Sequence, residues 1–571
     1  NISRWEQCID MKEATHNTHF TCDGKADVSY SICALRNLPY AGLVRVEVVA
    51  LGDMYLTVSN PIEIPDEYKN IGSKLVNVNV NGNDIKIVRT WALSKYREQK
   101  VSASSAFIYD KNSSVQQQYN GSGQISISLK KGEKFFFTLL GAVCTGRDFI
   151  DPYNESDREV IYGAKEGLTR LMDGHRKLWN EMWKGDIVIE GDDEAQRTVR
   201  FALYNLYSNA RKGSRLSIPP FGLSSQGYNG HIFWDTEFWM YPPMLFYESG
   251  HCTNNDGLSY EIGLEAACQK ALSYGYDGAM FPWESDDAGE EACPTWALTG
   301  PFEHHITADI AIAAWNYYCM SGDQRWLREE GFPLMEKVAE FWVSRVEKND
   351  DGSYSIRNVV CADEYAEGDD NAFTNGTVIR ALQDAAKAAS ICGLKAPVIW
   401  KEIAAKLRIP KFENGVTMEY DGYNGQVIKQ ADANLLVYPL NLITRPEEIR
   451  KDLEYYEGKI DKGGPAMSFS VLALQYARLG EGDKAYELFV QSFRPNQLPP
   501  FGVLSEGAGG TNPYFSTGAG GLLQAVINGF CGLEITDSGI KQLPSKLPGH
   551  WKKLVVKGVG PDGKTYVRLQ K

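Results

Sequence analysis

The chain of 571 residues lacks both a long hydrophobic run and an excess of basic residues. A membrane-spanning helix needs about 20 consecutive apolar residues, so we expect no membrane span. The formal net charge is −14 at pH 7, and a nucleic-acid surface is rich in Lys and Arg, so we expect no nucleic-acid partner. Hydrophobic residues at 43% and charged residues at 23% are typical of a globular protein. The length predicts roughly two to four domains.

Several motifs of metal and nucleophile chemistry are also missing. The eleven cysteines form no CxxC pair, which argues against zinc ribbons and thioredoxin-like chemistry. The eight histidines form no HExxH spacing, so we expect no metal ion and no cofactor. GxSxG is absent, and no Gly-Lys-Ser/Thr directly follows the Gly-rich segment from Val503 to Gly521. Acid–base catalysis by paired carboxylates is the most economical mechanism left.

An acidic run lies at the centre of what is present, between Val359 and Thr377. Its five carboxylates fall within eight residues: Asp363, Glu364, Glu367, Asp369 and Asp370. If part of the run is buried, at least one carboxyl should have a raised pKa and be able to donate a proton near neutral pH. The alternative is a solvated acidic loop in front of a helix, with Asp370 or Asn371 as its N-cap.

Two aromatic–carboxylate pairs suit a sugar pocket. Trp234-Asp235 and Trp283-Glu284 each place an indole beside a carboxylate, which can bind the apolar face and the hydroxyls of one sugar ring. The aromatic content of 12%, with 13 Trp and 30 Tyr, agrees with this hypothesis. Asp235 could instead cap a helix. For the carboxylates that follow Trp283-Glu284 we favour a solvated loop: Asp286, Asp287, Glu290 and Glu291.

Two further segments carry candidate polar groups. Lys429-Gln430 offers a cation beside an amide, a common pair for binding hydroxyls. Glu506 is the one side chain charged at neutral pH in the Gly-rich segment from Val503 to Gly521, and it is either a capping residue or a general base. A Gly-rich loop can also bind phosphate, although this pattern is weak.

The periodicity divides the chain into four parts. Residues 1–150 alternate with period two and predict an antiparallel β-sandwich. Residues 151–192 predict a helical linker, with one long helix from Arg158 to Met182 whose apolar stripe includes Tyr162, Leu168, Leu171, Leu178 and Trp179. Residues 193–532 predict a helical domain whose loops meet in a funnel, as in an α/α toroid. Residues 533–571 predict a small β-element.

Within the helical domain the apolar patterns predict about eleven helices. They are Gln196–Lys212, Tyr260–Tyr274, Ile306–Met320, Gln324–Lys348, Asn371–Ala389, Ala396–Lys406, Ala433–Leu442, Pro446–Tyr456, Ala466–Leu479, Gly482–Phe493 and Gly518–Asn528. Long loops rich in Gly, Pro and aromatic residues separate them, and such loops are usually functional.

Five ordered motifs resemble glycoside hydrolase family 65. They are Phe233-Trp234-Asp235-Thr236-Glu237, Phe281-Pro282-Trp283-Glu284-Ser285, His305-Ile306-Thr307-Ala308-Asp309-Ile310, Asp363-Glu364-Tyr365 with Asn371-Ala372-Phe373-Thr374-Asn375, and Lys429-Gln430-Ala431-Asp432. The resemblance implies an N-terminal β-sandwich, a helical linker, an (α/α)6 barrel and a C-terminal β-element. It implies inverting action on short α-glucosides, with Glu364 as general acid. It places glucose binding at Trp234, Asp235, Trp283, Glu284, Lys429 and Gln430.

The same resemblance separates two branches of the family. Glu506-Gly507-Ala508-Gly509-Gly510, with Phe515 to Gly521 behind it, is similar to the hydrolase branch, in which this Glu activates water. We therefore expect an inverting exo-α-glucosidase that acts on a kojibiose-, nigerose- or trehalose-type substrate. The alternatives are an inverting α-glucoside phosphorylase of the same fold and a non-catalytic sugar-binding protein. The chain departs from the family at Ala366, where a His is usual, and in its short N-terminal β-domain.

Few sequence features bear on the cellular compartment and the oligomeric state of the protein. The chain begins at Asn1 rather than Met, and Cys8, Cys22 and Cys33 lie close enough in sequence to form a disulfide. Both features favour a secreted or periplasmic protein. The sequence leaves the oligomeric state open, and a homodimer is compatible with it.

Overall fold

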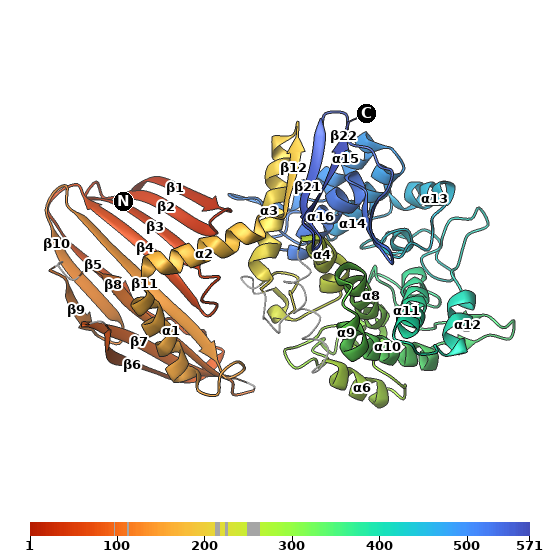
Figure 1. The fold of residues 1–571 in the computed structure, drawn as a ribbon, viewed down its shortest axis with the longest axis horizontal. Helices are drawn as coiled ribbons and strands as arrows, with labels where there is room; N and C mark the ends of the chain where they lie inside the picture. Colours follow the sequence, from red (N-terminus) through yellow and green to blue (C-terminus); the bar gives the residue numbers. More distant parts are fainter. Residues whose placement is uncertain are drawn as a thin grey trace. The chain divides into compact units, whose positions relative to one another are not determined.

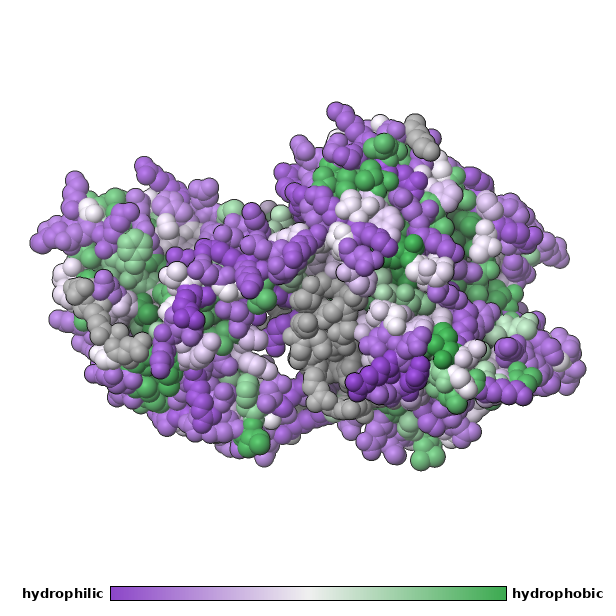
Figure 2. All heavy atoms as spheres, in the orientation of Figure 1, coloured by the Kyte–Doolittle hydropathy of each residue, from purple (hydrophilic) through white to green (hydrophobic). Residues whose placement is uncertain are grey.

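The computed structural model describes residues 1–80, 82–95, 97–110, 114–211, 217–222, 227–247 and 263–570. These residues form two compact units, Asn1–Trp183 and Lys184–Lys571 (Figure 1). We describe each unit separately. No helix in the described ranges is long and apolar enough to cross a membrane. On the face drawn in Figure 2, hydrophilic residues cover most of the surface and hydrophobic residues lie in small groups between them.

The first unit is built on an eight-stranded antiparallel sheet of order β1-β2-β3-β4-β11-β8-β7-β6. Its strands are β1 (Ile2–Asp10), β2 (Thr15–Cys22), β3 (Ala26–Ala34), β4 (Ala41–Ala50), β6 (Tyr68–Val80), β7 (Asn83–Ser94), β8 (Lys100–Tyr109) and β11 (Lys134–Thr145). Val80 pairs with Asn83 across a tight turn in which Gly82 has a φ of 74°. A hairpin therefore joins β6 to β7, although Asn81 lies outside the described residues.

Two separate cores cover the two faces of this sheet, as the period-two alternation requires. On β11, Phe135 and Phe137 pack toward a second sheet, while Leu140 and Ala142 pack on the opposite face. The second sheet has the order β5-β10-β9, with β5 (Met54–Asn60), β10 (Gly123–Leu129) and β9 (Gln116–Tyr119). The predicted β-sandwich is confirmed.

Two helices, rather than the single long helix we predicted, pack on the other face of the large sheet. They are α1 (Pro152–Glu166) and α2 (Leu168–Met182), and they meet at Gly167, whose φ of 87° a helix cannot contain. The break changes the helical phase, so Val160 and Leu171 are buried in the core with Leu140. Tyr162, which the single-helix stripe placed inside, is 54% exposed.

The three N-terminal cysteines are free thiols. In β1, Cys8 pairs with Asn17, whereas Cys22 pairs with Ile2 at the other end of the same strand. Cys33 lies in β3 opposite Leu43 and is buried. A disulfide needs Cα atoms within about 7 Å, and the register of these strands separates Cys8 from Cys22 by much more than that. The expected bridge is therefore not formed.

The second unit is mainly helical. Its α-helices are α3 (Asp193–Asn209), α4 (Tyr241–Tyr247), α6 (Leu264–Ser273), α7 (Thr299–Phe302), α8 (His305–Ser321), α9 (Gln324–Trp326), α10 (Phe332–Arg345), α11 (Ala372–Ile391), α12 (Val398–Lys406), α13 (Pro446–Tyr456), α14 (Met467–Arg478), α15 (Gly482–Gln491) and α16 (Ser516–Gln524). Helices α8, α11, α14 and α16 are buried along nearly their whole length, whereas α3, α13 and α15 bury one face.

The buried helices form a closed inner ring. Neighbours in contact follow the order α4 with the turn before it, α8, α11, the short 3-10 helix Ala433–Leu436, α14 and α16, and α16 returns to the turn before α4. The outer helices pack behind the ring, with α3 against α16, α10 against α11 and α15 against α14. This arrangement agrees with the predicted α/α barrel.

Two helical predictions inside this domain differ from the structure. The segment expected at Ala433–Leu442 forms only the 3-10 turn Ala433–Leu436. The helical segment 236–247 was missed, because Pro242-Pro243 argues against a helix. Thr236–Met240 is a π-helical turn in which Tyr241 N–H bonds to Thr236 C=O. Such a turn shifts the hydrogen-bond pattern just before the two prolines, which lack an N–H of their own.

Short strands complete the second unit. The sheet β12-β21-β22 joins the unit's first residues to its last ones, through β12 (Asp186–Glu190), β21 (Lys553–Val559) and β22 (Lys564–Leu569). Among the described residues, four two-stranded sheets fall between β12 and β21 in the chain: β13 (Glu347–Lys348) with β14 (Tyr354–Ser355), β15 (Val359–Val360) with β16 (Glu367–Gly368), β17 (Gln497–Leu498) with β18 (Val503–Leu504), and β19 (Leu533–Thr536) with β20 (Gly539–Gln542).

Candidate active site

The acidic run forms a hairpin that presents Glu364 at its tip. Val359 pairs with Gly368 and Val360 with Glu367, so the intervening residues form a closed loop. The N–H of Glu364 donates to Cys361 C=O at 2.8 Å, and the N–H of Cys361 donates to Ala366 C=O at 3.0 Å. Glu364 has a φ of 58°, a left-handed conformation that is unusual for a residue other than Gly. Such strain is concentrated at functional sites.

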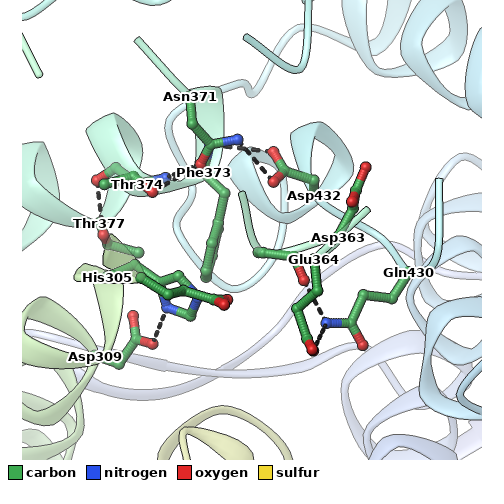
Figure 3. A network of polar contacts seen from close by, with 12 residues as sticks. His305, Asp309, Asp363, Glu364, Asn371, Phe373, Thr374, Thr377, Gln430 and Asp432 are labelled. Carbon is green, nitrogen blue, oxygen red and sulfur yellow. Dashed lines mark hydrogen bonds and ion pairs between the residues drawn. The ribbon is translucent and has the colours of Figure 1, made fainter. Parts of the chain in front are cut away.

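The carboxylate of Glu364 contacts both members of the Lys429-Gln430 pair. Lys429 Nζ lies 3.0 Å from Glu364 Oε2, and Gln430 Nε2 donates to Glu364 Oε1 at 3.2 Å. Gln430 also donates to Ala362 C=O, and Figure 3 shows its side-chain amide directed at Glu364. The two segments, more than sixty residues apart in the chain, therefore fix one another.

A buried polar network holds the other end of the acid loop to α11. Asn371 caps this helix, since its Oδ1 accepts from Thr374 N–H at 2.8 Å. Its Nδ2 donates to Asp432 Oδ2 at 2.8 Å (Figure 3). The same Nδ2 donates to Glu419 C=O at 3.0 Å. The expected N-cap is confirmed at Asn371.

Within the acidic run, the expected rise of a carboxyl pKa is found at Asp370, whereas proton donation near neutral pH stays a prediction. Burial raises the pKa of Asp370, whose oxygens accept from Ser355, Asn375 and Ile356 N–H. Burial likewise raises the pKa of Glu419 and Asp432 behind the loop. The loop is therefore supported from behind by carboxyl groups that retain protons more readily than free ones do.

Aromatic side chains form one wall of the site. Trp234, Trp283 and Phe373 surround the His305 ring, with ring centroids 4.9, 5.6 and 4.9 Å from it. His305 Nδ1 lies 2.7 Å from Asp309 Oδ2, and its Nε2 lies 3.0 Å from Glu303 Oε1. Burial raises the pKa of both Glu303 and Asp309 well above the usual range. A histidine fixed at both nitrogens thus sets the orientation of the aromatic wall.

The two carboxylates beside these tryptophans are also fixed by partners. Asp235 Oδ2 accepts from Thr517 Oγ1 at 2.5 Å, and burial raises the pKa of Asp235 to about 7. Its side chain makes no capping bond to the helical turn that follows, so the capping interpretation was wrong. Glu284 Oε1 lies 2.6 Å from His231 Nδ1.

Glu291, which we had assigned to a solvated loop, instead organises the site. Its carboxylate accepts from Trp283 N–H at 2.8 Å, Glu284 N–H at 3.0 Å and Cys293 N–H at 3.1 Å, and from Lys270 Nζ at 2.6 Å. Asp286 is also ordered, because it accepts from Ala288 N–H at 2.7 Å and closes a turn. The expected exposure holds for Asp287 and Glu290.

Glu506 lies between β18 and α16 and faces Tyr228. Tyr228 Oη lies 3.0 Å from Glu506 Oε1 and 2.9 Å from Oε2, so the phenol donates to the carboxylate. Burial raises the pKa of Glu506, while Tyr228 and Lys429 partly oppose that shift. The N-cap position of α16 is occupied by Phe515, so Glu506 does not cap that helix.

One pocket of about 580 Å³ contains every residue that we assigned to the site. These residues are Trp234, Asp235, Trp283, Glu284, Glu364, Lys429, Gln430 and Glu506. The sequence did not indicate Tyr228, His231 or Thr517 as their partners. Only the short motif Gly227-Tyr228-Asn229-Gly230 hints at Tyr228, because it marks a turn next to the first aromatic–carboxylate pair.

Comparison with known proteins identifies the family of the chain. Two family models match: "Glycosyl hydrolase family 65, N-terminal domain" over residues 1–182 and "Glycosyl hydrolase family 65 central catalytic domain" over residues 200–425. A kojibiose hydrolase of Flavobacterium johnsoniae is 47% identical over 99% of this chain and 85% of its own length. A kojibiose phosphorylase of Thermoanaerobacter brockii is more distant, at 30% identity over 70% of this chain and 59% of its own length.

A solved structure shares the fold. It comes from the human microbiome, is provisionally named a kojibiose phosphorylase, and matches with a TM-score of 0.81 at 16% sequence identity. The match covers 100% of this chain and 81% of that one. At that identity the likeness concerns the fold alone.

Proposed function

The chain belongs to glycosyl hydrolase family 65 and is an α-glucoside hydrolase, and from this premise we propose that it is an inverting exo-α-glucosidase that releases β-glucose from a short substrate of the kojibiose, nigerose or trehalose type. Glucose binds at the closed end of the pocket. Trp234 and Trp283 cover its apolar face, and Asp235, Glu284, Lys429 and Gln430 bind its hydroxyls.

The chemistry is assigned to two carboxyl groups. Glu364 donates its proton to the glycosidic oxygen as the bond from C1 to that oxygen breaks. Glu506 takes a proton from a water molecule as the water oxygen bonds to C1 from the other face of the sugar. The configuration at C1 is inverted. After the reaction Glu364 is ionised and Glu506 is protonated, and proton exchange with solvent restores the starting state of both groups.

The charges lining the pocket support water rather than phosphate as the nucleophile. Among the described lining residues Lys429 alone is basic, and it is paired with Glu364. Five lining residues carry carboxyl groups: Asp235, Glu284, Glu364, Glu367 and Glu506. A phosphate dianion beside Glu506 would be repelled by that carboxylate, whereas a neutral water would be polarised by it. The position of Glu506 in the pocket is the observation that carries the proposal.

Two substitutions separate the two roles. Glu364→Gln should lower the turnover of an α-glucosyl disaccharide by about 10²–10⁴-fold, the usual range for general acid–base catalysis. The same variant should retain much more activity on α-glucosyl fluoride, because fluoride leaves with little protonation. Glu506→Gln should lose activity on both substrates, because each requires an activated water. Initial rates of glucose release for the two variants on the two substrates measure this difference.

Asp287→Asn supplies a matched control, since it removes an exposed carboxylate that does not line the pocket. It should leave both rates unchanged. Near-normal disaccharide hydrolysis by Glu364→Gln or by Glu506→Gln would remove that residue from the mechanism.

A further inference from the structure

The pocket has a closed end and an open end. At the closed end, Trp234 and Trp283 are buried, as the glucose-binding assignment requires. At the open end, Trp296 is 83% exposed and Tyr365 is 59% exposed, yet both line the same pocket. Leu298 is exposed beside Trp296. Single exposed apolar residues are common on protein surfaces, but large aromatic residues grouped at the mouth of a pocket indicate a binding surface.

Trp296 lies on an ordered turn. Ala297 N–H donates to Pro294 C=O at 2.9 Å, and Cys293 Sγ lies 3.3 Å from Thr299 Oγ1. The turn is tied to the closed end through Glu291, which accepts from Cys293 N–H as well as from Trp283 N–H and Glu284 N–H. One carboxylate therefore fixes the start of the turn that carries the exposed indole relative to the glucose-binding wall, so that a ligand could bind both without reordering the turn.

Tyr365, the second exposed aromatic residue of the pocket, is fixed by contacts with Asp363 and Asp461. It follows Glu364 directly, and its hydroxyl donates to Asp461 Oδ2 at 3.0 Å. Its N–H donates to Asp363. The ring is thus exposed while both its backbone and its hydroxyl are fixed. A fixed aromatic surface binds a sugar with little loss of side-chain entropy.

The position of Glu364 gives the direction of the aglycone. Because Glu364 protonates the oxygen that links glucose to the aglycone, the aglycone extends from Glu364 away from the closed end. Ala366 lines this path and presents only a methyl group to it. The first aglycone unit lies beside Glu364, so groups farther out toward solvent reach the surfaces of Tyr365 and Trp296.

We propose that Trp296 and Tyr365 form an aglycone platform, which binds a further sugar unit beyond the one next to the cleaved bond. The substrate is then an α-glucoside whose aglycone is longer than a single sugar. This inference rests on the proposed function, since it uses the acid role of Glu364 to orient the substrate.

The test compares three substrates that differ only on the aglycone side: α-glucosyl fluoride, an α-glucosyl disaccharide, and the trisaccharide of the same linkage with one more sugar at its reducing end. Trp296→Ala should lower the ratio of kcat/KM for the trisaccharide to kcat/KM for the fluoride roughly tenfold, the scale of one lost stacking contact. The corresponding ratio for the disaccharide should change much less. Trp296→Phe, which keeps a smaller ring, should give an intermediate loss.

Trp5→Ala is the matched control. Trp5 is 52% exposed in the first unit and does not line this pocket, so its removal should change none of the ratios. An unchanged trisaccharide ratio in Trp296→Ala would overturn the platform, and so would an equal fall of kcat/KM on all three substrates. A wild-type enzyme that hydrolyses none of the three would overturn the proposed function, and the platform with it.

Discussion

At the scale of single residues, the pocket places one cation among several carboxyl groups. Lys429 pairs with Glu364 and also favours the ionised form of Glu506. Burial acts in the opposite direction on Glu506 and raises its pKa. The general base must be ionised to accept a proton, so the balance between burial and its polar contacts sets the lowest pH at which the enzyme works.

Tyr228→Phe tests this balance. The phenol hydroxyl donates to both oxygens of Glu506, and its removal should raise the pKa of that carboxyl further. A higher pKa keeps Glu506 protonated to higher pH, so the acidic limb of kcat/KM should move up by about one pH unit, the equivalent of one hydrogen bond to a charged group. A pH profile of kcat/KM for the variant and the wild type measures the shift.

Tyr354→Phe is the control for that experiment, because it also removes a Tyr–Glu hydrogen bond, to Glu402 at 3.2 Å, but outside the pocket. Its pH profile should match that of the wild type. If the acidic limb of Tyr228→Phe stays in place or moves to lower pH, Tyr228 does not control the ionisation of the base.

The site residues that the sequence predicted are those in contiguous motifs. An indole next to a carboxylate, or an acidic pair in front of a helix cap, can be recognised locally. The partners that fix them cannot, because Tyr228 and Glu506 lie 278 positions apart and Thr517 and Asp235 lie 282 apart. The error at Glu291 has a different origin. Its carboxylate accepts from Trp283 N–H and Cys293 N–H, which are near in sequence but lie on both sides of a turn that only the folded loop brings together.

At the scale of elements, the junction between the acid loop and α11 is the main support of the site. Asn371 satisfies the first turn of α11 and also bonds to Asp432, which lies beside the Lys429-Gln430 segment. Glu364 therefore has two connections to the Lys429-Gln430 segment. One is its direct contact with both side chains, and the other runs through Asn371 at the start of α11 to Asp432.

Asn371→Ala should destabilise the protein and reduce activity together. It removes the N-cap and leaves the buried Asp432 without one donor, and the two losses sum to roughly 2–4 kcal/mol. Thermal unfolding and the rate of glucose release from a disaccharide measure the two effects.

Asp323→Ala provides the comparison at an exposed helix start. Asp323 accepts from Arg325 N–H and Trp326 N–H, both at 2.9 Å, and its loss should cost about 1 kcal/mol without affecting activity. Equal destabilisation in the two variants would show that Asn371 acts only as a cap.

Most helices and strands could be predicted from the local pattern of apolar residues. The predictions failed where an unusual backbone conformation interrupts that pattern. The apolar stripe from Arg158 to Met182 is continuous in the sequence, but Gly167 adopts a φ of 87° and divides it into two helices. The helical segment 236–247 was missed because its prolines follow a π-helical turn rather than an α-helical one. Neither geometry has a distinctive residue pattern.

At the scale of the whole molecule, the sequence predicted which domains are built of strands and which of helices. It did not predict which strands pair with one another. The alternating runs predict strands, but the order β4-β11-β8 brings together strands far apart in the chain. The strand β21 likewise pairs with β12, at the start of the second unit, and β22 pairs with β21. These pairings depend on which apolar faces meet in the folded chain, which the period of one segment does not determine.

The measurement that tests the central claim most directly is the anomeric configuration of the first product. Proton NMR during hydrolysis of an α-glucosyl disaccharide, with and without inorganic phosphate, distinguishes β-glucose, α-glucose and glucose 1-phosphate before mutarotation equilibrates the sugar. Direct attack of water, activated by Glu506, predicts that β-glucose is formed first and that phosphate does not change the rate. Initial release of α-glucose, or turnover only with phosphate to give glucose 1-phosphate, would contradict the assignment of Glu364 as acid and Glu506 as base in an inverting hydrolase.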